Sequence, residues 1–249
     1  MHRPTADRPL RLFRPLRNRP PAQLARRLVQ LYVGLALYGA SMALQIRAAL
    51  GLDPWDVFHQ GLTRHIGLSF GTITMIVGAA VLLLWIPLRQ RPGLGTVSNV
   101  FVIGLSVDAA LALLPTPHGV PLRICLLMAG IVLNGMAGGL YIGARFGPGP
   151  RDGLMTGFCR RTGRSVRLVR TTIEVTVLVV GVLMGGSVGI GTVAYALAIG
   201  PLVQIFLPLF TVPGGPAASG SGPEAAAPAV APAVALEREL VEPAEPVAR

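Results

Sequence analysis

The sequence predicts an all-α membrane protein in which six transmembrane helices form two inverted three-helix repeats. Composition, an internal duplication and the placement of arginine lead to this prediction. Of the 249 residues, 52% are hydrophobic and 13% are charged, and the mean hydropathy is +0.61. Such a chain has too few polar side chains to cover a soluble domain of this size. We therefore expect the lipid bilayer to be its main partner.

An internal duplication with an offset of 96 residues divides the chain into two copies. Residues 31–108 align with residues 127–204 without a gap, and 23 of the 78 aligned pairs are identical. The most distinctive matches pair Gly51-Leu-Asp-Pro-Trp-Asp with Gly147-Pro-Gly-Pro-Arg-Asp, and Gly93-Leu-Gly-Thr-Val with Gly189-Ile-Gly-Thr-Val. Self-similarity at a fixed offset indicates a repeated structural unit.

Six apolar segments have about the 20 residues that a helix needs to cross an apolar core of about 30 Å. The last two are separated by so little polar sequence that their common boundary is poorly defined. The predicted spans are Leu28–Ile46, Phe70–Leu88, Leu94–Leu114, Ile124–Gly143, Thr171–Ile190 and Gly191–Val212. They place membrane repeat 1 at residues 28–123 and membrane repeat 2 at residues 124–212.

Two polar tails flank the predicted repeats. Residues 1–27 carry eight arginines without apolar periodicity and are expected to form a disordered basic arm. A cleaved signal peptide is the weaker alternative, because the apolar run that follows is long and has a counterpart in the middle of the chain. Residues 213–249 are rich in alanine, proline and glutamate and are expected to form a disordered acidic tail.

Arginine placement orients the predicted helices. With a cytoplasmic N-terminus, only Arg47, Arg64 and Arg123 lie outside, whereas all other arginines lie inside. Positive residues gather on the cytoplasmic side of membrane proteins, so both termini are predicted to be inside the cytoplasmic membrane. Each copy has an odd number of spans, and the second copy is therefore inverted. The arginines that give the net charge of +11 lie in clusters beside the apolar segments. This distribution indicates membrane topology, and we expect no nucleic-acid partner.

The duplicated polar stretch predicts two short helices that begin at equivalent positions. Asp53 and Pro54 suit the cap and first turn of one helix, and Gly149 and Pro150 suit those of the other. Asp56 and Asp152 fall in the two first turns. Two interpretations remain open: the helices lie amphipathically at the membrane surface, or they are re-entrant half-helices whose N-termini meet a solute near the membrane centre.

Other polar residues inside the predicted spans are candidates for a substrate or ion pathway. Asp108 is the strongest, because an ionised carboxylate there costs at least about 2.5–3.5 kcal/mol, and it is a candidate proton or cation site. Its repeat partner is Gln204. Asn99 is either a pathway residue or an interhelical hydrogen-bonding group. Together with Asp56 and Asp152, these residues form the predicted pathway.

The sequence offers no catalytic set. The four histidines are scattered, Cys125 and Cys159 cannot form a disulfide or metal framework, and no nucleotide-binding glycine loop is present. We therefore predict a protein that is not an enzyme and that has no cofactor and no metal.

Four stretches of the first copy resemble a known group. They are Gly51-Leu-Asp-Pro-Trp-Asp-Val-Phe-His-Gln-Gly-Leu, Gly67-Leu-Ser-Phe-Gly-Thr, Trp85-Ile-Pro-Leu and Gly93-Leu-Gly-Thr-Val-Ser-Asn. They are similar to the YczE/YyaS/YitT group of bacterial multi-pass membrane proteins, over about residues 28–212. The second copy is looser, with Arg151 in place of Trp55. The resemblance implies a plasma-membrane protein of bacteria and brings no substrate, cofactor or catalytic residue.

Two functions fit these features. The first is a secondary transporter or permease for a small solute, in which the two halves move about a shared site. The alternative is a non-transporting membrane component that supports or regulates a partner complex through its two tails. A homodimer is possible, because Gly135, Gly139 and Gly143 give one predicted span a close-packing face.

Overall fold

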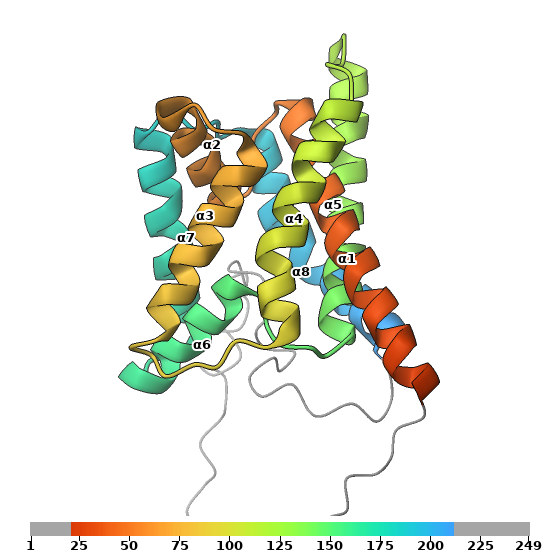
Figure 1. Ribbon diagram of the computed structural model, residues 1–249. Helices are drawn as coiled ribbons and strands as arrows, with labels where there is room; N and C mark the ends of the chain where they lie inside the picture. The colour runs from red at the N-terminus through yellow and green to blue at the C-terminus, as the bar shows by residue number, and fades with distance from the viewer. Residues whose placement is uncertain (1–20, 212–249) are drawn as a thin grey trace, which may run out of the picture.

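The computed structural model describes residues 21–211, which form eight α-helices and no strands (Figure 1). The predicted tail and most of the predicted arm lie outside the described residues. The helices are α1 Pro21–Ala48, α2 Pro54–Ile66, α3 Phe70–Trp85, α4 Leu94–Leu113, α5 Val120–Gly143, α6 Pro150–Thr162, α7 Val166–Leu183 and α8 Ile190–Phe210.

The helix bounds repeat the sequence duplication. At an offset of 96 residues, α2 coincides with α6 end to end, and α1, α3 and α4 match α5, α7 and α8 to within a few residues. Each short helix has proline in its first turn and ends at a left-handed glycine, Gly67 at φ 74° or Gly163 at φ 67°. Glycine adopts this conformation at low cost, so equivalent glycines end equivalent helices.

The helices pack in two groups that cross the duplication. In the scaffold group, α1 packs against α5 and α4, and α5 packs against α8. In the second group, α2 packs against α7 and α3, and α6 packs against α3 and α7. Contacts between α3 and α4 are the main helix packing that joins the two groups. The two short helices lie at opposite ends of the bundle, α2 at the top and α6 at the bottom of Figure 1.

Small residues set the spacing inside the scaffold group. A Cβ atom on Gly34 of α1 would lie 2.8 Å from the backbone nitrogen of Tyr141 on α5, so the two helices pack nearly backbone to backbone. The predicted small-residue face of α5 contacts α8 of the same chain, where Gly135 meets Leu202 and Gly139 meets Phe206. That face is therefore covered within the chain and does not support the homodimer. The homodimer stays a prediction.

Four helices, α1, α4, α5 and α8, are long and apolar enough to cross a membrane. The predicted span at Phe70–Leu88 ends at Trp85, and α3 passes the same test only together with α2, from which it is bent by 113°. The predicted span at Thr171–Ile190 is instead α7 at Val166–Leu183, which begins at the cap Ser165 and carries three charged residues. The six-span count thus exceeds what length and composition alone support.

The first helix begins earlier than predicted, at Pro21 instead of Leu28. Arg27 lies in the added turns, and its Nε donates a hydrogen bond of 2.9 Å to the carbonyl oxygen of Ala144. Its guanidinium also lies 4.5 Å above the ring of Phe146. The last residues of the predicted arm are therefore tied to the end of α5.

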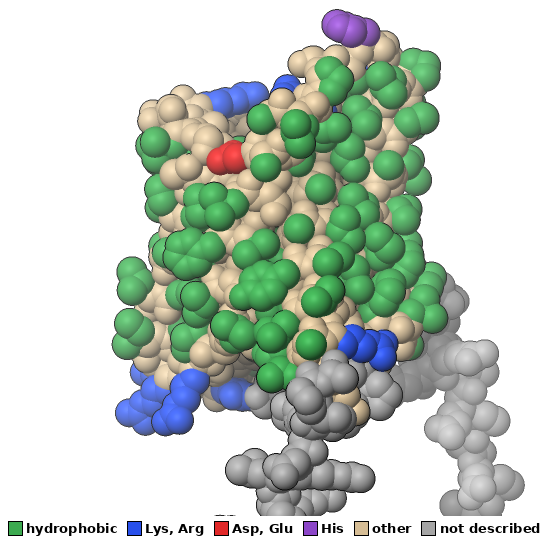
Figure 2. Space-filling model, turned by 45° about the vertical axis from the view of Figure 1, so that its right-hand side comes forward, with side chains coloured by type: hydrophobic (Ala, Val, Ile, Leu, Met, Phe, Trp, Pro, Cys, Tyr) green, Lys and Arg blue, Asp and Glu red, His purple; other side chains and the backbone are tan. Residues whose placement is uncertain are grey.

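The surface of the bundle is divided along its length. Figure 2 shows hydrophobic side chains over the middle of the face, with arginines gathered at its two ends. The exposed apolar residues come from both groups and include Phe101 and Leu105 of α4, Ile76 of α3 and Val132 of α5. An apolar belt between two charged ends is the surface that a bilayer covers.

Candidate functional site

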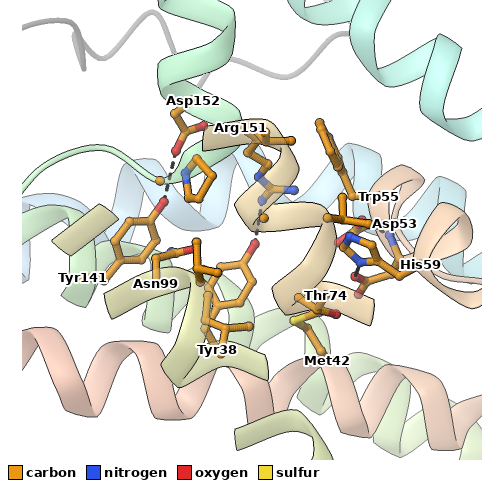
Figure 3. Close-up of a pocket in the computed structure, with 18 residues that line it drawn as sticks. Tyr38, Met42, Asp53, Trp55, His59, Thr74, Asn99, Tyr141, Arg151 and Asp152 are labelled. Atoms are coloured by element: carbon orange, nitrogen blue, oxygen red, sulfur yellow. Dashed lines mark hydrogen bonds and ion pairs between the residues drawn. The ribbon is translucent and has the colours of Figure 1, made fainter. Parts of the chain in front are cut away.

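A cavity of about 90 Å³ lies between the two helix groups (Figure 3). This volume holds several waters or a solute of a few heavy atoms. The cavity is lined by α1, α3, α4 and α5 and by the first turns of both short helices. Its polar lining residues are Tyr38, Asp53, Asp56, His59, Thr74, Asn99, Tyr141, Arg151 and Asp152.

The start of α2 carries two buried carboxylates. Asp53 is 3% exposed, and its Oδ1 accepts a hydrogen bond of 3.0 Å from the backbone N–H of Asp56. The side chain thus caps the helix, as the sequence predicted. Asp56 itself is only 2% exposed. Because water does not solvate these groups, their interactions within the protein decide their charge and their use.

The start of α6 is built differently. Its cap residue is Gly149, which has no side chain to satisfy the first N–H groups of the helix. Arg151 Nη2 donates a hydrogen bond of 2.6 Å to the hydroxyl of Tyr38 on α1. The hydroxyl of Tyr141 on α5 donates one of 3.2 Å to Asp152 Oδ2. Two tyrosines of the scaffold group therefore hold the charged side chains of this helix (Figure 3).

The two short helices meet at their first turns, although their other ends lie far apart. The repeat partners Trp55 and Arg151 line the same pair of neighbouring pockets. Trp55 packs in one apolar cluster with Leu154 of α6 and with Trp85 of α3. The Trp85 indole donates a hydrogen bond of 3.0 Å to the carbonyl oxygen of Pro150. Both helix starts are therefore buried inside the bundle.

The charges around the cavity do not balance. Asp53, Asp56 and Asp152 face one guanidinium, that of Arg151, and no described carboxylate forms an ion pair with it. Asp56 Oδ1 lies 3.3 Å from His59 Nδ1, and its other oxygen, Oδ2, is buried without a hydrogen-bond partner. Buried polar atoms are nearly always paired, so an unpaired carboxylate oxygen in a cavity indicates a site for a ligand or a proton.

The structure brings together most of the residues that the sequence proposed. Asp56, Asp152 and Asn99 line the cavity, with the helix-start residues Asp53, Gly149 and Pro150; Pro54 opens α2 beside them.

Asp108 and Gln204 lie outside the cavity. Asp108 accepts hydrogen bonds from the Ser69 hydroxyl at 2.6 Å and from the Gly71 N–H at 2.7 Å. It thus joins α4 to the N-terminus of α3, where orphan N–H groups favour a carboxylate. Gln204 is exposed on α8.

Five polar lining residues were absent from the sequence predictions, namely Tyr38, His59, Thr74, Tyr141 and Arg151. Arg151 could have been included, because it occupies the position of Trp55 inside the duplicated motif. His59 lies three residues after Asp56, one helical turn away. Tyr38 and Tyr141 gave no signal, because tyrosines in apolar helices are common and only the packing of α1 against α5 turns them toward the cavity.

Residues 25–208, which include every residue of the cavity, match a family of unknown function, DUF6198. The chain is a member of DUF6198. No solved structure matches it.

Curated relatives of this DUF6198 protein occur in Haemophilus influenzae and Bacillus subtilis. An uncharacterized protein of Haemophilus influenzae is 38% identical over 177 residues, which cover 71% of this chain and 81% of the relative. The uncharacterized membrane protein YczE of Bacillus subtilis is 35% identical over 71% of this chain and 83% of its own. YyaS of the same species is 25% identical over 71% and 90%. The predicted YczE-like membrane family is thus confirmed.

Proposed function

We propose that this DUF6198 protein is a non-enzymatic secondary transporter or permease for a small solute in the bacterial cytoplasmic membrane. One observation carries the proposal: two short helices from equivalent positions of a duplicated chain begin together at a buried, charged cavity between two helix groups. Short, interrupted helices at matching positions of two halves mark the binding site in many secondary transporters.

In the proposed topology, α1, α3, α4, α5, α7 and α8 span the membrane, and α2 and α6 are re-entrant. At 1.5 Å per residue, the 16 residues of α3 and 18 of α7 measure about 24 and 27 Å, near the thickness of the apolar core. The opposite positions of α2 and α6 in Figure 1 support an inverted repeat. The arginine distribution supports cytoplasmic termini.

The two equivalent interfaces between the helix groups differ, and this difference supports alternating access. Along α3 and α4, a Cβ atom on Gly71 would lie 2.0 Å from the carbonyl oxygen of Gly104. Between the repeat partners α7 and α8, no comparable packing joins the described residues. We interpret the structure as one of two states. In the other state, α7 would close on α8 while α3 would part from α4.

Paired cysteines test this exchange. A Cβ atom on Gly78 of α3 would lie 3.6 Å from Val100 Cβ on α4, within the range that a disulfide requires. The repeat partners of these two residues are Glu174 on α7 and Ala196 on α8. In a background without Cys125 and Cys159, we expect Gly78→Cys/Val100→Cys to cross-link rapidly in membranes. Glu174→Cys/Ala196→Cys should also cross-link, because the second state is visited.

The matched control is Gly78→Cys/Ala196→Cys, which joins non-equivalent positions and should not cross-link in either state. Formation of both matched disulfides, each preventing the other in a four-cysteine variant, would support the transport cycle. Cross-linking of the α3–α4 pair alone would contradict it. That result would favour the non-transporting membrane component.

A further inference from the structure

We infer that the cavity binds its solute through an ammonium group, and that Asp56 is the carboxylate that receives it. The inference rests on the proposed function and names the substrate class of the same site.

Among the described residues, Asp56 has the only carboxylate oxygen that is buried and has no hydrogen-bond partner. Asp53 is engaged as the cap of α2, and Asp152 accepts the hydrogen bond of Tyr141. Asp56 Oδ1 is held by His59 at 3.3 Å, whereas Oδ2 is buried and has no partner. An ionised carboxylate only accepts hydrogen bonds, so His59 Nδ1–H is the donor in this contact. His59 thus positions the carboxylate through Oδ1 and leaves Oδ2 unpaired, on a residue that lines the cavity.

The charge balance points to a positive ligand group. Three carboxylates and one guanidinium leave an excess of negative charge when all four are ionised. Uncompensated charge is costly in a buried site inside a membrane. A cationic group at Asp56 reduces this cost, whereas an anion without a positive group adds to it. The N–H groups at the start of α6 and the remaining donors of Arg151 could also bind a carboxylate on the same solute.

The shape of the site favours an organic ammonium group over a metal ion. Within residues 21–211, no three His, Cys, Asp or Glu side chains are placed to hold a metal ion together. Aromatic rings line the cavity instead, those of Trp55, Tyr38 and Tyr141. Their faces attract ammonium groups, with about 0.5–2 kcal/mol for each good contact. A cavity of about 90 Å³ has room for a small organic ammonium solute.

The two tryptophans of the chain provide the readout. Trp55 lines the cavity, and Trp85 packs beside it on the start of α6. Purified protein in detergent would be titrated at pH 7 with four probes of similar size: ethanolamine, glycine, ethylene glycol and glycolate. They carry an ammonium group alone, an ammonium with a carboxylate, no charge, and a carboxylate alone.

We expect saturable changes in tryptophan fluorescence with ethanolamine, with glycine or with both, and none with ethylene glycol or glycolate. A response to ethanolamine alone identifies an amine, and a stronger response to glycine identifies an amino-acid-like solute. Binding of glycolate, equal binding of ethylene glycol, or no response to either ammonium probe would overturn the inference. These comparisons vary the probe and need no variant to fold.

Asp56→Asn should weaken ammonium binding at least tenfold, because it removes the charge and keeps the size. Asp108→Asn is the matched control, since it makes the same change outside the cavity and keeps an acceptor oxygen for the Gly71 N–H; its affinity should be unchanged. Loss of binding in Asp108→Asn with full binding in Asp56→Asn would overturn the assignment. The cysteine cross-links need no ligand, so failure of the transport cycle and failure of this inference are separate results.

Discussion

The two copies of the duplication keep the same backbone devices and differ in the side chains that they bring to the cavity. Each copy starts its last helix with Gly-x-Gly-Thr-Val, and this start is docked on the other copy. The Gly95 N–H donates to the carbonyl oxygen of Phe146 at 2.9 Å, and the Gly191 N–H donates to that of Leu50 at 2.8 Å. These contacts are equivalent at the 96-residue offset, and their close approach explains why the glycines recur.

The cavity shows the opposite pattern. At the 96-residue offset, Asp53 corresponds to Gly149, and Trp55 corresponds to Arg151. The start of α2 is therefore acidic and aromatic, whereas that of α6 carries one guanidinium and one carboxylate and has no side-chain cap. The comparison teaches that a fold with two similar halves can hold one asymmetric site, with a different charge at each half-helix.

The largest effect is expected at a helix contact that occurs in both copies, but with the large and the small residue on opposite helices. On α6, Gly153 packs under Trp85 of α3; the partner contact joins Val57 of α2 to Gly181 of α7. A Cβ atom on Gly153 would lie 1.9 Å from the Trp85 ring. Gly153→Val should therefore lower the free energy of unfolding by about 3 kcal/mol or more, measured by thermal unfolding in detergent.

The double variant Gly153→Val/Trp85→Gly tests the cause of this loss. It recreates in one contact the pairing that the other copy uses, and it should regain part of the stability. A single variant as stable as the natural protein would show that the two contacts are not complementary.

The next effect concerns the carboxylate that joins α3 to α4. Asp108→Ala removes the acceptor of two hydrogen bonds, from Ser69 and Gly71. It should weaken the α3–α4 contact by about 1–3 kcal/mol and shift cross-linking from Gly78/Val100 toward Glu174/Ala196. The repeat-partner variant Gln204→Ala is the control, because this exposed side chain should contribute less than about 0.5 kcal/mol. An equal shift in both variants would contradict the assigned role of Asp108.

The smallest effect distinguishes the two docked helix starts. The Thr96 hydroxyl donates to the carbonyl oxygen of Pro148 at 2.8 Å and accepts from the Gly93 N–H at 3.1 Å. The Thr192 hydroxyl accepts from the Gly189 N–H at 3.3 Å. Thr96→Val should cost about 1 kcal/mol or slightly more, and Thr192→Val less. Chemical unfolding of the two variants measures this order, and a reversed order would argue against it.

Much of the fold could be predicted because its signals are local. Proline and glycine mark both ends of α2 and α6, and long apolar runs mark α1, α4, α5 and α8. The bounds of α7 were misplaced because its first turns carry arginines, and the cap Ser165 gave a weaker signal than hydropathy.

The site was harder to predict, because its members come together only through packing. The duplicated motif identified Asp56 and Asp152, which are close to the helix starts that meet in the bundle. The depth of Asp108 in the sequence of α4 predicts a pathway residue, but its carboxylate accepts a hydrogen bond from the N-terminus of α3 instead. No local pattern could show that Tyr38 would hold Arg151 from a helix of the other copy.

Cysteine accessibility in intact cells tests the central claim, that the copies are inverted and their short helices open toward opposite faces. His65 near the end of α2 and its repeat partner Arg161 near the end of α6 are both exposed. Single cysteines there, in a background without Cys125 and Cys159, would be probed with a membrane-impermeant maleimide. Leu154→Cys, a buried position, is the unlabelled control. We predict labelling of His65→Cys only from outside and of Arg161→Cys only from the cytoplasm; labelling of both from one side would contradict the inverted architecture.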